Sequence, residues 1–488
     1  MLDYYLQVEG VNLDNVLADT QNISVIRGSS LLLRQSIRDI EHRYFKEKAC
    51  ISSGASAGLF QFRAESEADA MQKRQDLVNY LNSDSHYQHF TFVVNIQAAD
   101  NFTKDKEKLL AKNRFQQMQQ LSVVMPESSK KQVECELDNL RPANRKARIK
   151  QKLSSESASE YRQKNSVSTS VHKRWQHGRK QRKEFYKQEA GLTGYQVTKD
   201  LTTLATSKNQ KLNNKIAVFY CDGNGFGKIQ QEHCKTAEAL NNFDRKIQTY
   251  RREFLTALLE WTNEQDDFRT ENNELRLETL LWGGDEFTLV VPAWYGLAMI
   301  DFFYCFSKKW QFNDIPLTHA GGLVFAHAKA PIQRVQKLAK DLAERVKDYP
   351  GGKTANYLEY AVLESIDFPT ESLEDFHKGL FGDLEKNRPL LTPLNESMRE
   401  QAIQLKNIVS KGQVYVLARA ILDNKFEKQL ERLLEVTDFP DTLKDKLQAL
   451  QDYLDAIFPN INLDSKLKWQ CLHLVDLWDY VGGDENND

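Results

Sequence analysis

Apolar residues recur along the chain with two different periods, and each period predicts one type of element. Residues 4–9 alternate between apolar and polar side chains, as a strand with one buried face does. Residues 216–221 form a continuous apolar run, which is typical of a central strand buried on both faces. The segment 332–349 repeats apolar residues every three or four positions and predicts an amphipathic helix.

The first hundred residues predict a β-α-β-β-α-β order, the order of ferredoxin-like domains. After the strand at 4–9, an amphipathic helix is expected to run to about Phe45. A hairpin is expected within 50–62, followed by a helix over 65–81 and a strand over 89–96.

A hairpin with an acidic tip is the most informative motif of the chain. Two apolar runs within 280–292 meet at Gly283 and Gly284, which are followed by Asp285 and Glu286. The glycines can adopt φ > 0 and let a phosphate approach the backbone. Two carboxylates at a hairpin tip contribute little to packing and are suited to binding a divalent cation. From the residues alone, an ordinary acidic hairpin remains the alternative.

A second carboxylate site is predicted where the strand at 216–221 ends. Asp222 stands at this strand end and is followed by the glycine-rich residues 223–227. Such glycines beside a carboxylate suggest close approach of the backbone to phosphate, which Lys228 could help to neutralise. A plain turn rich in Asp, Asn and Gly is the alternative.

Together, the two motifs resemble the palm domain shared by nucleotide cyclases and template-independent nucleotide polymerases. The resemblance implies that Asp222 and Asp285 bind two Mg²⁺ (or Mn²⁺) with help from the Gly223 carbonyl. Glu286 is implied as a further metal ligand or as a base. The implied reaction is attack of a ribose 3′-hydroxyl on the α-phosphate of a second nucleoside triphosphate, releasing pyrophosphate. The residues implied in nucleotide binding are Gly223, Asn224, Phe226, Lys228, Gly283, Gly284 and Lys347.

Within this family, the stretch downstream of the hairpin favours one branch. Diguanylate cyclases share the five hairpin residues, but the Arg-x-x-Asp inhibitory motif that they often carry is absent from 274–278. The stretch 316–331 resembles a strand-turn-helix of the large polymerase-like subunit of type III CRISPR effector complexes. Lys347 matches a lysine position of that subunit and is implied as a triphosphate ligand; a lysine near a helix end is also simply favourable with the dipole.

The amino terminus resembles the first palm-like domain of the same subunit. Its hairpin carries Ser-Gly-Ala-Ser-Ala-Gly at 53–58, where Gly-Gly-Asp would stand, so it offers no carboxylate for a metal. The resemblance implies two palm domains packed face to face, one degenerate and one with the metal-binding carboxylates. The degenerate domain is implied to help hold the second of the two nucleotides. The sequence shows no His-Asp pair of the kind that marks the family's nuclease domain, so a compact relative without DNA cleavage is expected.

The sequence is divided into four predicted domains, which give an α+β protein with two ferredoxin-like palm domains. The carboxyl-terminal domain is expected to be a bundle of four or five helices. The domains are 1–105 (degenerate palm), 106–205 (basic, mostly helical insert), 206–375 (catalytic palm) and 376–488 (helical).

Positive charge is concentrated in one segment, although the net charge of the chain is only −2. Residues 141–187 contain fifteen Lys or Arg against three Asp or Glu, interleaved with Tyr161, Trp175 and Tyr186. This mixture suits guide or target RNA, or single-stranded nucleic acid. The alternative is a helical arm that packs on the acidic remainder of the protein. Other effector subunits are further possible partners, through this segment or the carboxyl-terminal helices.

Composition excludes several other classes of protein. No run approaches the ~20 apolar residues of a membrane span, and the first residues do not form a signal peptide. The six cysteines show no zinc or disulfide spacing, and Asp138 stands where the resemblance would place the second zinc cysteine after Cys135. A cytoplasmic protein without membrane contact is expected.

These observations predict a metal-dependent nucleotidyltransferase that makes cyclic or short oligonucleotide messengers in antiviral defence. ATP is the substrate that the resemblance implies. Two alternatives remain, a diguanylate-cyclase-like enzyme and a non-catalytic scaffold that binds RNA through 141–187.

Overall fold

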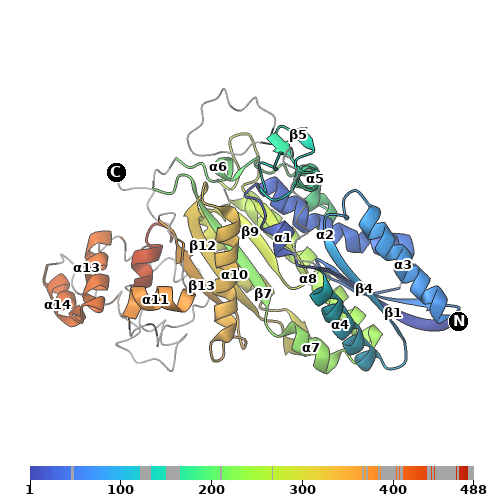
Figure 1. Ribbon diagram of the computed structural model, residues 1–488. Coiled ribbons are helices and arrows are strands. Elements are labelled where there is room, and N and C mark those ends of the chain that lie inside the picture. The colour runs from blue at the N-terminus through green and yellow to red at the C-terminus, as the bar shows by residue number, and fades with distance from the viewer. Residues whose placement is uncertain are drawn as a thin grey trace.

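The computed structural model shows an α+β protein, as predicted, with two main sheets side by side and helices around them (Figure 1). The described residues are 1–45, 49–120, 133–149, 165–208, 211–265, 267–364, 368–369, 372–382, 385, 403, 406, 410–436, 441, 445, 469 and 472–481. Tyr161 and most of the predicted carboxyl-terminal bundle lie outside the described residues. Among the described helices, none has the length and apolar character that crossing a membrane requires.

The amino-terminal sheet has the order that a β-α-β-β-α-β chain gives. Its elements are β1 (Leu2–Val11), α1 (Asp14–Leu17), α2 (Ile23–Tyr44), β2 (Cys50–Ser53), β3 (Ala57–Ala64), α3 (Glu67–Ser83), β4 (Thr91–Ala98) and α4 (Phe102–Gln119). The strands lie in the order β2-β3-β1-β4, and all of the pairs are antiparallel. Leu32 of α2 and Leu77 of α3 share one core with Leu6 and Phe60 of the sheet, so both helices cover the same face.

The second sheet has the same arrangement with one strand added at its edge. Its elements are β7 (Lys215–Gly223), α7 (Phe226–His233), α8 (Ala237–Glu264), β8 (Glu278–Trp282), β9 (Phe287–Pro292), a 3₁₀ turn (Ala293–Tyr295), α9 (Gly296–Ser307), β10 (Gln311–Phe312), β11 (Ile315–Pro316), β12 (His319–His327), α10 (Ile332–Asp348) and β13 (Tyr357–Val362). The strand order is β13-β12-β7-β9-β8, and only β12 and β13 are parallel. The central position of β7 explains its continuous apolar run.

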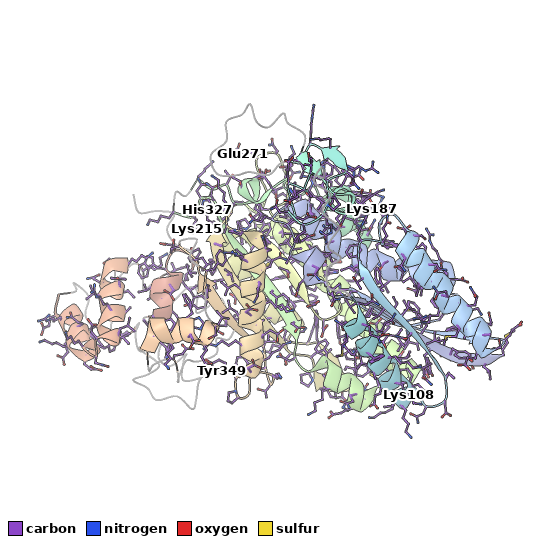
Figure 2. The ribbon with its side chains drawn as sticks, in the orientation of Figure 1. Lys108, Lys187, Lys215, Glu271, His327 and Tyr349 are labelled. Atoms are coloured by element: carbon purple, nitrogen blue, oxygen red, sulfur yellow. The ribbon has the colours of Figure 1, made fainter. Side chains whose placement is uncertain are left out.

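The two faces of the second sheet are covered by different helices. Phe219 and Cys221 of β7 pack with residues of α8 and α9, whereas Val218 and Tyr220 pack against α10. Because side chains alternate along a strand, Asp222 lies on the α10 side of the sheet. Lys215 and His327 pair in register at one end of the sheet, and Tyr349, directly after α10, lies at the other end (Figure 2).

A segment between the sheets joins them through a close helix crossing. It contains β5 (Arg145–Ala147), β6 (Asn165–Val167), α5 (Thr169–Ala190) and α6 (Leu201–Leu204). Where α2 crosses α5, a Cβ on Gly28 would lie 1.8 Å from the Arg174 carbonyl oxygen, and one on Gly178 would lie 1.9 Å from the Ser24 carbonyl oxygen. Only glycines allow the two backbones to approach so closely.

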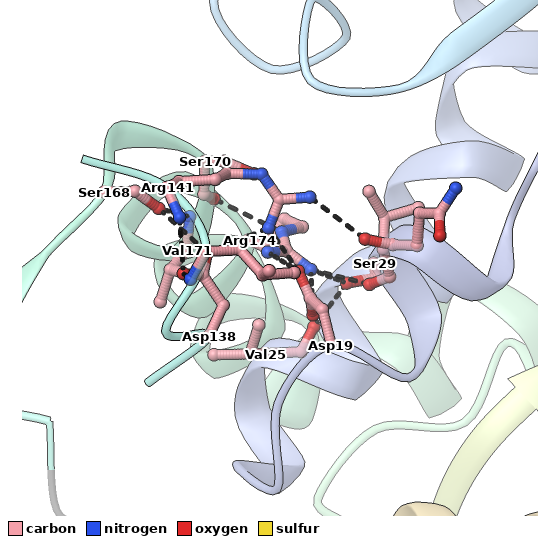
Figure 3. A network of polar contacts seen from close by, with 12 residues as sticks. Asp19, Val25, Ser29, Asp138, Arg141, Ser168, Ser170, Val171 and Arg174 are labelled. Carbon is pink, nitrogen blue, oxygen red and sulfur yellow. Dashed lines mark hydrogen bonds and ion pairs between the residues drawn. The ribbon is translucent and has the colours of Figure 1, made fainter. Parts of the chain in front are cut away.

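Two arginines of the basic segment are used inside the protein. The Arg174 side chain has an exposed fraction of 0% and donates to Asp19 Oδ1 (2.9 Å), Asp19 Oδ2 (2.7 Å) and the Val16 carbonyl (2.6 Å) (Figure 3). Arg141 pairs with Asp19 and with Asp138, which also accepts the Leu140 N–H. For Arg174, on α5, packing on acidic residues is the correct interpretation, and Arg141, in the loop before β5, packs on the same carboxylate. Asp138 serves as an ion-pair partner at the position where the resemblance would place a zinc cysteine.

Polar side chains of α8 cover the edge strand of the amino-terminal sheet. Asn241 Nδ2 donates to the Cys50 carbonyl (2.9 Å) and the Ile51 carbonyl (3.2 Å) of β2. Asp244 accepts the Ser53 N–H at 3.2 Å. Burial raises the pKa of Asp244 to about 7. Backbone groups that an edge strand would otherwise leave unpaired are therefore bonded to α8, a helix that packs on the second sheet.

The described part of the carboxyl-terminal region lies beyond β13 (Figure 1). It includes α11 (Leu373–Phe381), α13 (Lys411–Leu422), α14 (Phe426–Val436) and a short helical segment at 472–477. Trp469 and Trp478 pack with α13, while Tyr480 stacks on Phe325 of β12 at 4.1 Å between ring centroids. The last described residues therefore connect this region to the core of the second sheet.

We expect Gly28→Ala to destabilise the protein by about 3 kcal/mol or more, because the added methyl group collides with backbone that cannot move aside. Urea unfolding of the full chain measures this. Gly379→Ala, in α11 with nothing within 4 Å of the added Cβ, is the matched control and should be neutral or slightly stabilising. Equal unfolding midpoints for Gly28→Ala and the parent would contradict the close crossing.

Candidate active site

The end of β7 is bonded to the turn of the β8–β9 hairpin. Gly223 N–H donates to the Asp285 carbonyl at 3.2 Å, which continues the pairing of β7 with β9. Gly223 cannot carry a side chain, because a Cβ there would lie 2.7 Å from the Phe226 ring. The strand-end Asp222 and the hairpin acids are thus brought to neighbouring positions, as the sequence predicts.

The hairpin turn is tight and touches the amino-terminal sheet. Gly283 N–H donates to the Glu286 carbonyl at 2.8 Å, so Gly284 and Asp285 form the turn. Neither glycine has a positive φ, so that part of the sequence argument is wrong. Gly283 is closely packed instead: a Cβ there would lie 3.0 Å from the Glu286 side chain and 3.2 Å from the Ala55 Cβ, in the turn between β2 and β3. The two hairpins therefore meet at their tips.

Three carboxylates and one lysine interact at this end of the sheet. Lys347, in the last turn of α10, forms an ion pair with Asp222. The Tyr220 hydroxyl donates to Glu286 Oε2 at 2.8 Å. Burial, together with the charge of Asp222, raises the pKa of the half-buried Asp285 to about 6. Burial also raises the pKa of Glu286. The excess of negative charge is what a bound cation would relieve.

The donor atoms fit a divalent cation, although they do not form a finished cage. In the described part of the chain, no three His, Cys, Asp or Glu side chains surround a common point closely enough to hold a metal. Asp222, Asp285 and the Gly223 carbonyl are hard oxygen ligands of the kind that Mg²⁺ and Mn²⁺ prefer. Glu286 is directed to Tyr220 instead.

Asn224 joins the strand end to two neighbouring loops. Its Nδ2 donates to Thr318 Oγ1 and to the Ala355 carbonyl, both at 3.1 Å. Its side chain is buried, and no described residue donates a hydrogen bond to its Oδ1. A carboxylate could not donate the two bonds that this amide makes, which explains why Asn stands here.

Two residues predicted from sequence are not brought to the carboxylates. Phe226 is buried and packs edge-to-face on Phe243 and His319, so it supports Gly223 from inside the core. Lys228 is exposed and its Nζ lies 3.8 Å from Glu232 on the same helix. The nucleotide-binding role of either residue stays a prediction.

Sequence reasoning missed two residues that contact the site. Tyr220 is two positions before Asp222 on β7, and the period of a strand could have placed both side chains on one face. Arg251 of α8 donates from Nη1 to the Gly284 carbonyl at 3.1 Å. No motif marks Arg251, because its partner is a backbone atom far away in the sequence.

Comparison with known proteins gives a likeness of fold. No family model and no curated protein matches the sequence. The apo Csm1–Csm4 cassette matches with a TM-score of 0.54 and 10% identity, covering 97% of this chain and 69% of that chain. The cassette in complex with cA4 gives 0.52 at 10% identity, and the complex with pppApApA gives 0.51 at 11%, both with the same coverage. The chain thus has the fold found in these CRISPR subunits, in agreement with the resemblance seen in sequence.

We expect Asp285→Asn to stabilise the metal-free protein at pH 8, and to do so by a smaller amount at pH 5. The folded-state pKa of about 6 lies above the ordinary value of 3.8, so the parent loses stability as pH rises from about 3.8 to 6, whereas the Asn variant, which stays neutral, does not. The apparent melting temperature at pH 8 should rise by roughly 2–4 °C.

Melting curves of the parent, Asp285→Asn and the exposed control Glu253→Gln at both pH values, with and without Mg²⁺, make this measurement. Mg²⁺ should raise the melting temperature of the parent and the control, but not that of Asp285→Asn. The same pH dependence in the parent and Asp285→Asn would contradict the described electrostatics.

Proposed function

We propose that this chain is a metal-dependent nucleotidyltransferase that joins nucleoside triphosphates into cyclic or short oligonucleotide messengers. The observation that supports this most is the gathering of Asp222, Asp285, Glu286 and Lys347 where β7 meets the β8–β9 hairpin. In this proposal the second sheet is a catalytic palm and the amino-terminal sheet a degenerate one.

The role proposed for the protein in antiviral defence and its substrate rest on the likeness of fold. Solved structures with this fold are Csm1–Csm4 cassettes in complex with cA4 and with pppApApA. ATP is therefore the substrate that we propose, and a second effector subunit is the partner that we propose.

Asp222, Asp285 and the Gly223 carbonyl would hold Mg²⁺ or Mn²⁺. When bound, such ions lower the pKa of an attacking hydroxyl and stabilise the leaving oxygens. Lys347 forms an ion pair with Asp222 in the structure. With a metal bound to Asp222, the Lys347 ammonium would be free to bind the triphosphate instead. Tyr220 fixes the Glu286 carboxylate, which would accept a proton from the attacking hydroxyl.

The smallest residues of the site would admit the phosphates. Gly284 has open space where a Cβ would stand, and Gly283 packs against Ala55. A nucleotide could therefore approach the turn along its backbone from the side of Gly284. Asn224 would act by holding the loops at Thr318 and Ala355 around the strand end.

A second candidate function is binding of RNA, and one surface favours it. Helix α5 exposes Arg179, Lys180, Lys183 and Lys187, while Arg174 is occupied in the interior. Four exposed cations at three- and four-residue spacing share one helix face. This face would contact a phosphate backbone, whether the protein is a scaffold or an enzyme that RNA regulates.

The test of the enzyme is incubation of the purified chain with each of the four triphosphates, alone and in pairs, with Mg²⁺ or Mn²⁺. Mass spectrometry should detect cyclic or linear oligonucleotides from ATP. The variant Asp285→Ala/Glu286→Ala should lose at least about a hundredfold in rate, because the charges of the transition state lose their partners.

Glu253→Ala, an exposed carboxylate change on α8, controls for a general loss of acidic charge and should match the parent. Products from GTP alone would favour the cyclase alternative. Products that persist in the double variant would contradict the proposed site. A protein that makes no product with any triphosphate, with or without single-stranded RNA, would favour the scaffold.

The RNA surface has a test of its own. Replacing Lys180, Lys183 and Lys187 by Gln should weaken binding of single-stranded RNA and reduce the slope of log affinity against log salt by about 2. Fluorescence anisotropy at several salt concentrations measures both quantities. Lys104, Lys108 and Lys112 on α4, replaced in the same way, are the matched control (Figure 2 labels Lys108). An equal loss in both triple variants would show that only total charge matters.

A further inference from the structure

Arg251 is a buried cation with an unusual set of contacts. It lies on α8 with an exposed fraction of only 6%. Its Nη1 donates to the Gly284 carbonyl at 3.1 Å, and its guanidinium lies 4.9 Å from the centre of the Trp282 ring. Trp282 is the last residue of β8, so Arg251 contacts the hairpin on both sides of Gly283.

The charges around Arg251 are mixed, because Arg34 opposes its charge while Glu189, Asp244 and Asp285 favour it. Arg34 of α2 and Arg38 of α2 both pair with Glu189 of α5, at 2.5 Å and 2.8 Å. Burial, together with the positive charge of Arg34, lowers the pKa of Arg251 to about 9. Among the described residues, its Nε and Nη2 have no hydrogen-bond partner.

Such an arginine is a poor choice for stability alone. A buried cation without a full set of partners costs free energy, and an apolar side chain of similar length would pack here at lower cost. What the arginine adds is a directed side-chain bond to the Gly284 carbonyl, in a turn whose other bonds are made by backbone groups. Gly283 and Gly284 have no side chains, and a Cβ on Gly284 would meet nothing within 4 Å.

We infer that Arg251 is a positioning residue that fixes the Gly283–Gly284 turn and thereby the place of Asp285. This inference rests on the proposed function, since it gives Asp285 a task that depends on its position. Arg251 does not touch a substrate in this arrangement. It acts through the Gly284 carbonyl, and the Trp282 ring holds its guanidinium in place. Small errors in the position of a reacting group are enough to lower a rate by about a hundredfold.

The test compares Arg251→Met and Arg251→Lys with the parent in the full-length protein. Hydrogen exchange would be followed in peptides that contain Gly223 and Gly283, whose N–H groups are bonded across the turn. Arg251→Met should speed this exchange by about tenfold or more, since a hydrogen bond from a charged group is lost. Arg251→Lys, which keeps the charge and one possible donor, should give an intermediate value.

The same variants would be assayed for nucleotide transfer. Arg251→Met should lower kcat by about 10–100-fold with KM within about twofold, because the turn and not the binding of nucleotide is affected. Arg252→Ala, an exposed arginine at the next position, is the matched control and should equal the parent in both experiments. Leu77→Ala is a second control: it lowers the stability of the protein in the core between α3 and the amino-terminal sheet, away from the hairpin.

The outcomes separate the possible explanations. If Leu77→Ala speeds exchange at Gly223 and Gly283 as much as Arg251→Met does, Arg251 has only a general structural role and the inference is wrong. Unchanged exchange and kcat in Arg251→Met also overturn it. If the parent makes no product under any condition, the proposed function fails, while the exchange experiment still decides whether Arg251 fixes the turn.

Discussion

The crossing of α2 and α5 at Gly28 and Gly178 is the contact on which the arrangement of this protein depends. With backbones this close, Arg27 of α2 reaches the Gly178 carbonyl with Nη1 (3.0 Å) and Glu278, at the start of β8, with Nε (2.6 Å). Arg174 of α5 reaches Asp19, just before α2. A wider crossing would separate all of these buried partners and leave their charges without compensation. The helix that joins the two sheets is therefore fixed in both position and rotation.

The geometry of the candidate site depends on that helix crossing. Glu189, in the last turn of α5, pairs with Arg34 and Arg38 close to the part of α8 that carries Arg251. From the other direction, the β2–β3 turn places Ala55 against Gly283. The hairpin with its two acids is thus held from behind by α8 and from the side by the amino-terminal sheet. The position of the hairpin therefore depends on contacts with both sheets, although Asp222, Asp285 and Glu286 all belong to the second sheet.

The sequence predicts those parts of the structure that local patterns determine. The apolar run before Asp222 becomes the central strand, the Gly-Gly turn becomes a hairpin, and Lys347 reaches Asp222 from the end of a periodic helix. The α+β class follows from the same patterns. What the sequence does not show has a long-range cause. Phe226 looks available beside its glycines but is drawn into the core by Phe243 and His319. Charge counting alone could not show that Arg174 is internal, because its partner Asp19 is 155 residues away.

The covered edge of β2 has a consequence for how the chain is made on the ribosome. The strand is complete at Ser53, but the carboxylate that accepts its N–H, Asp244, follows 191 residues later. At ordinary speeds of translation this interval lasts roughly 10–40 s. During that time the first sheet can fold while its outer edge still offers free backbone groups to any other extended chain. Nascent copies on one polysome are the nearest such chains, so the arrival of α8 closes a period of exposure that begins long before the acidic hairpin is synthesised.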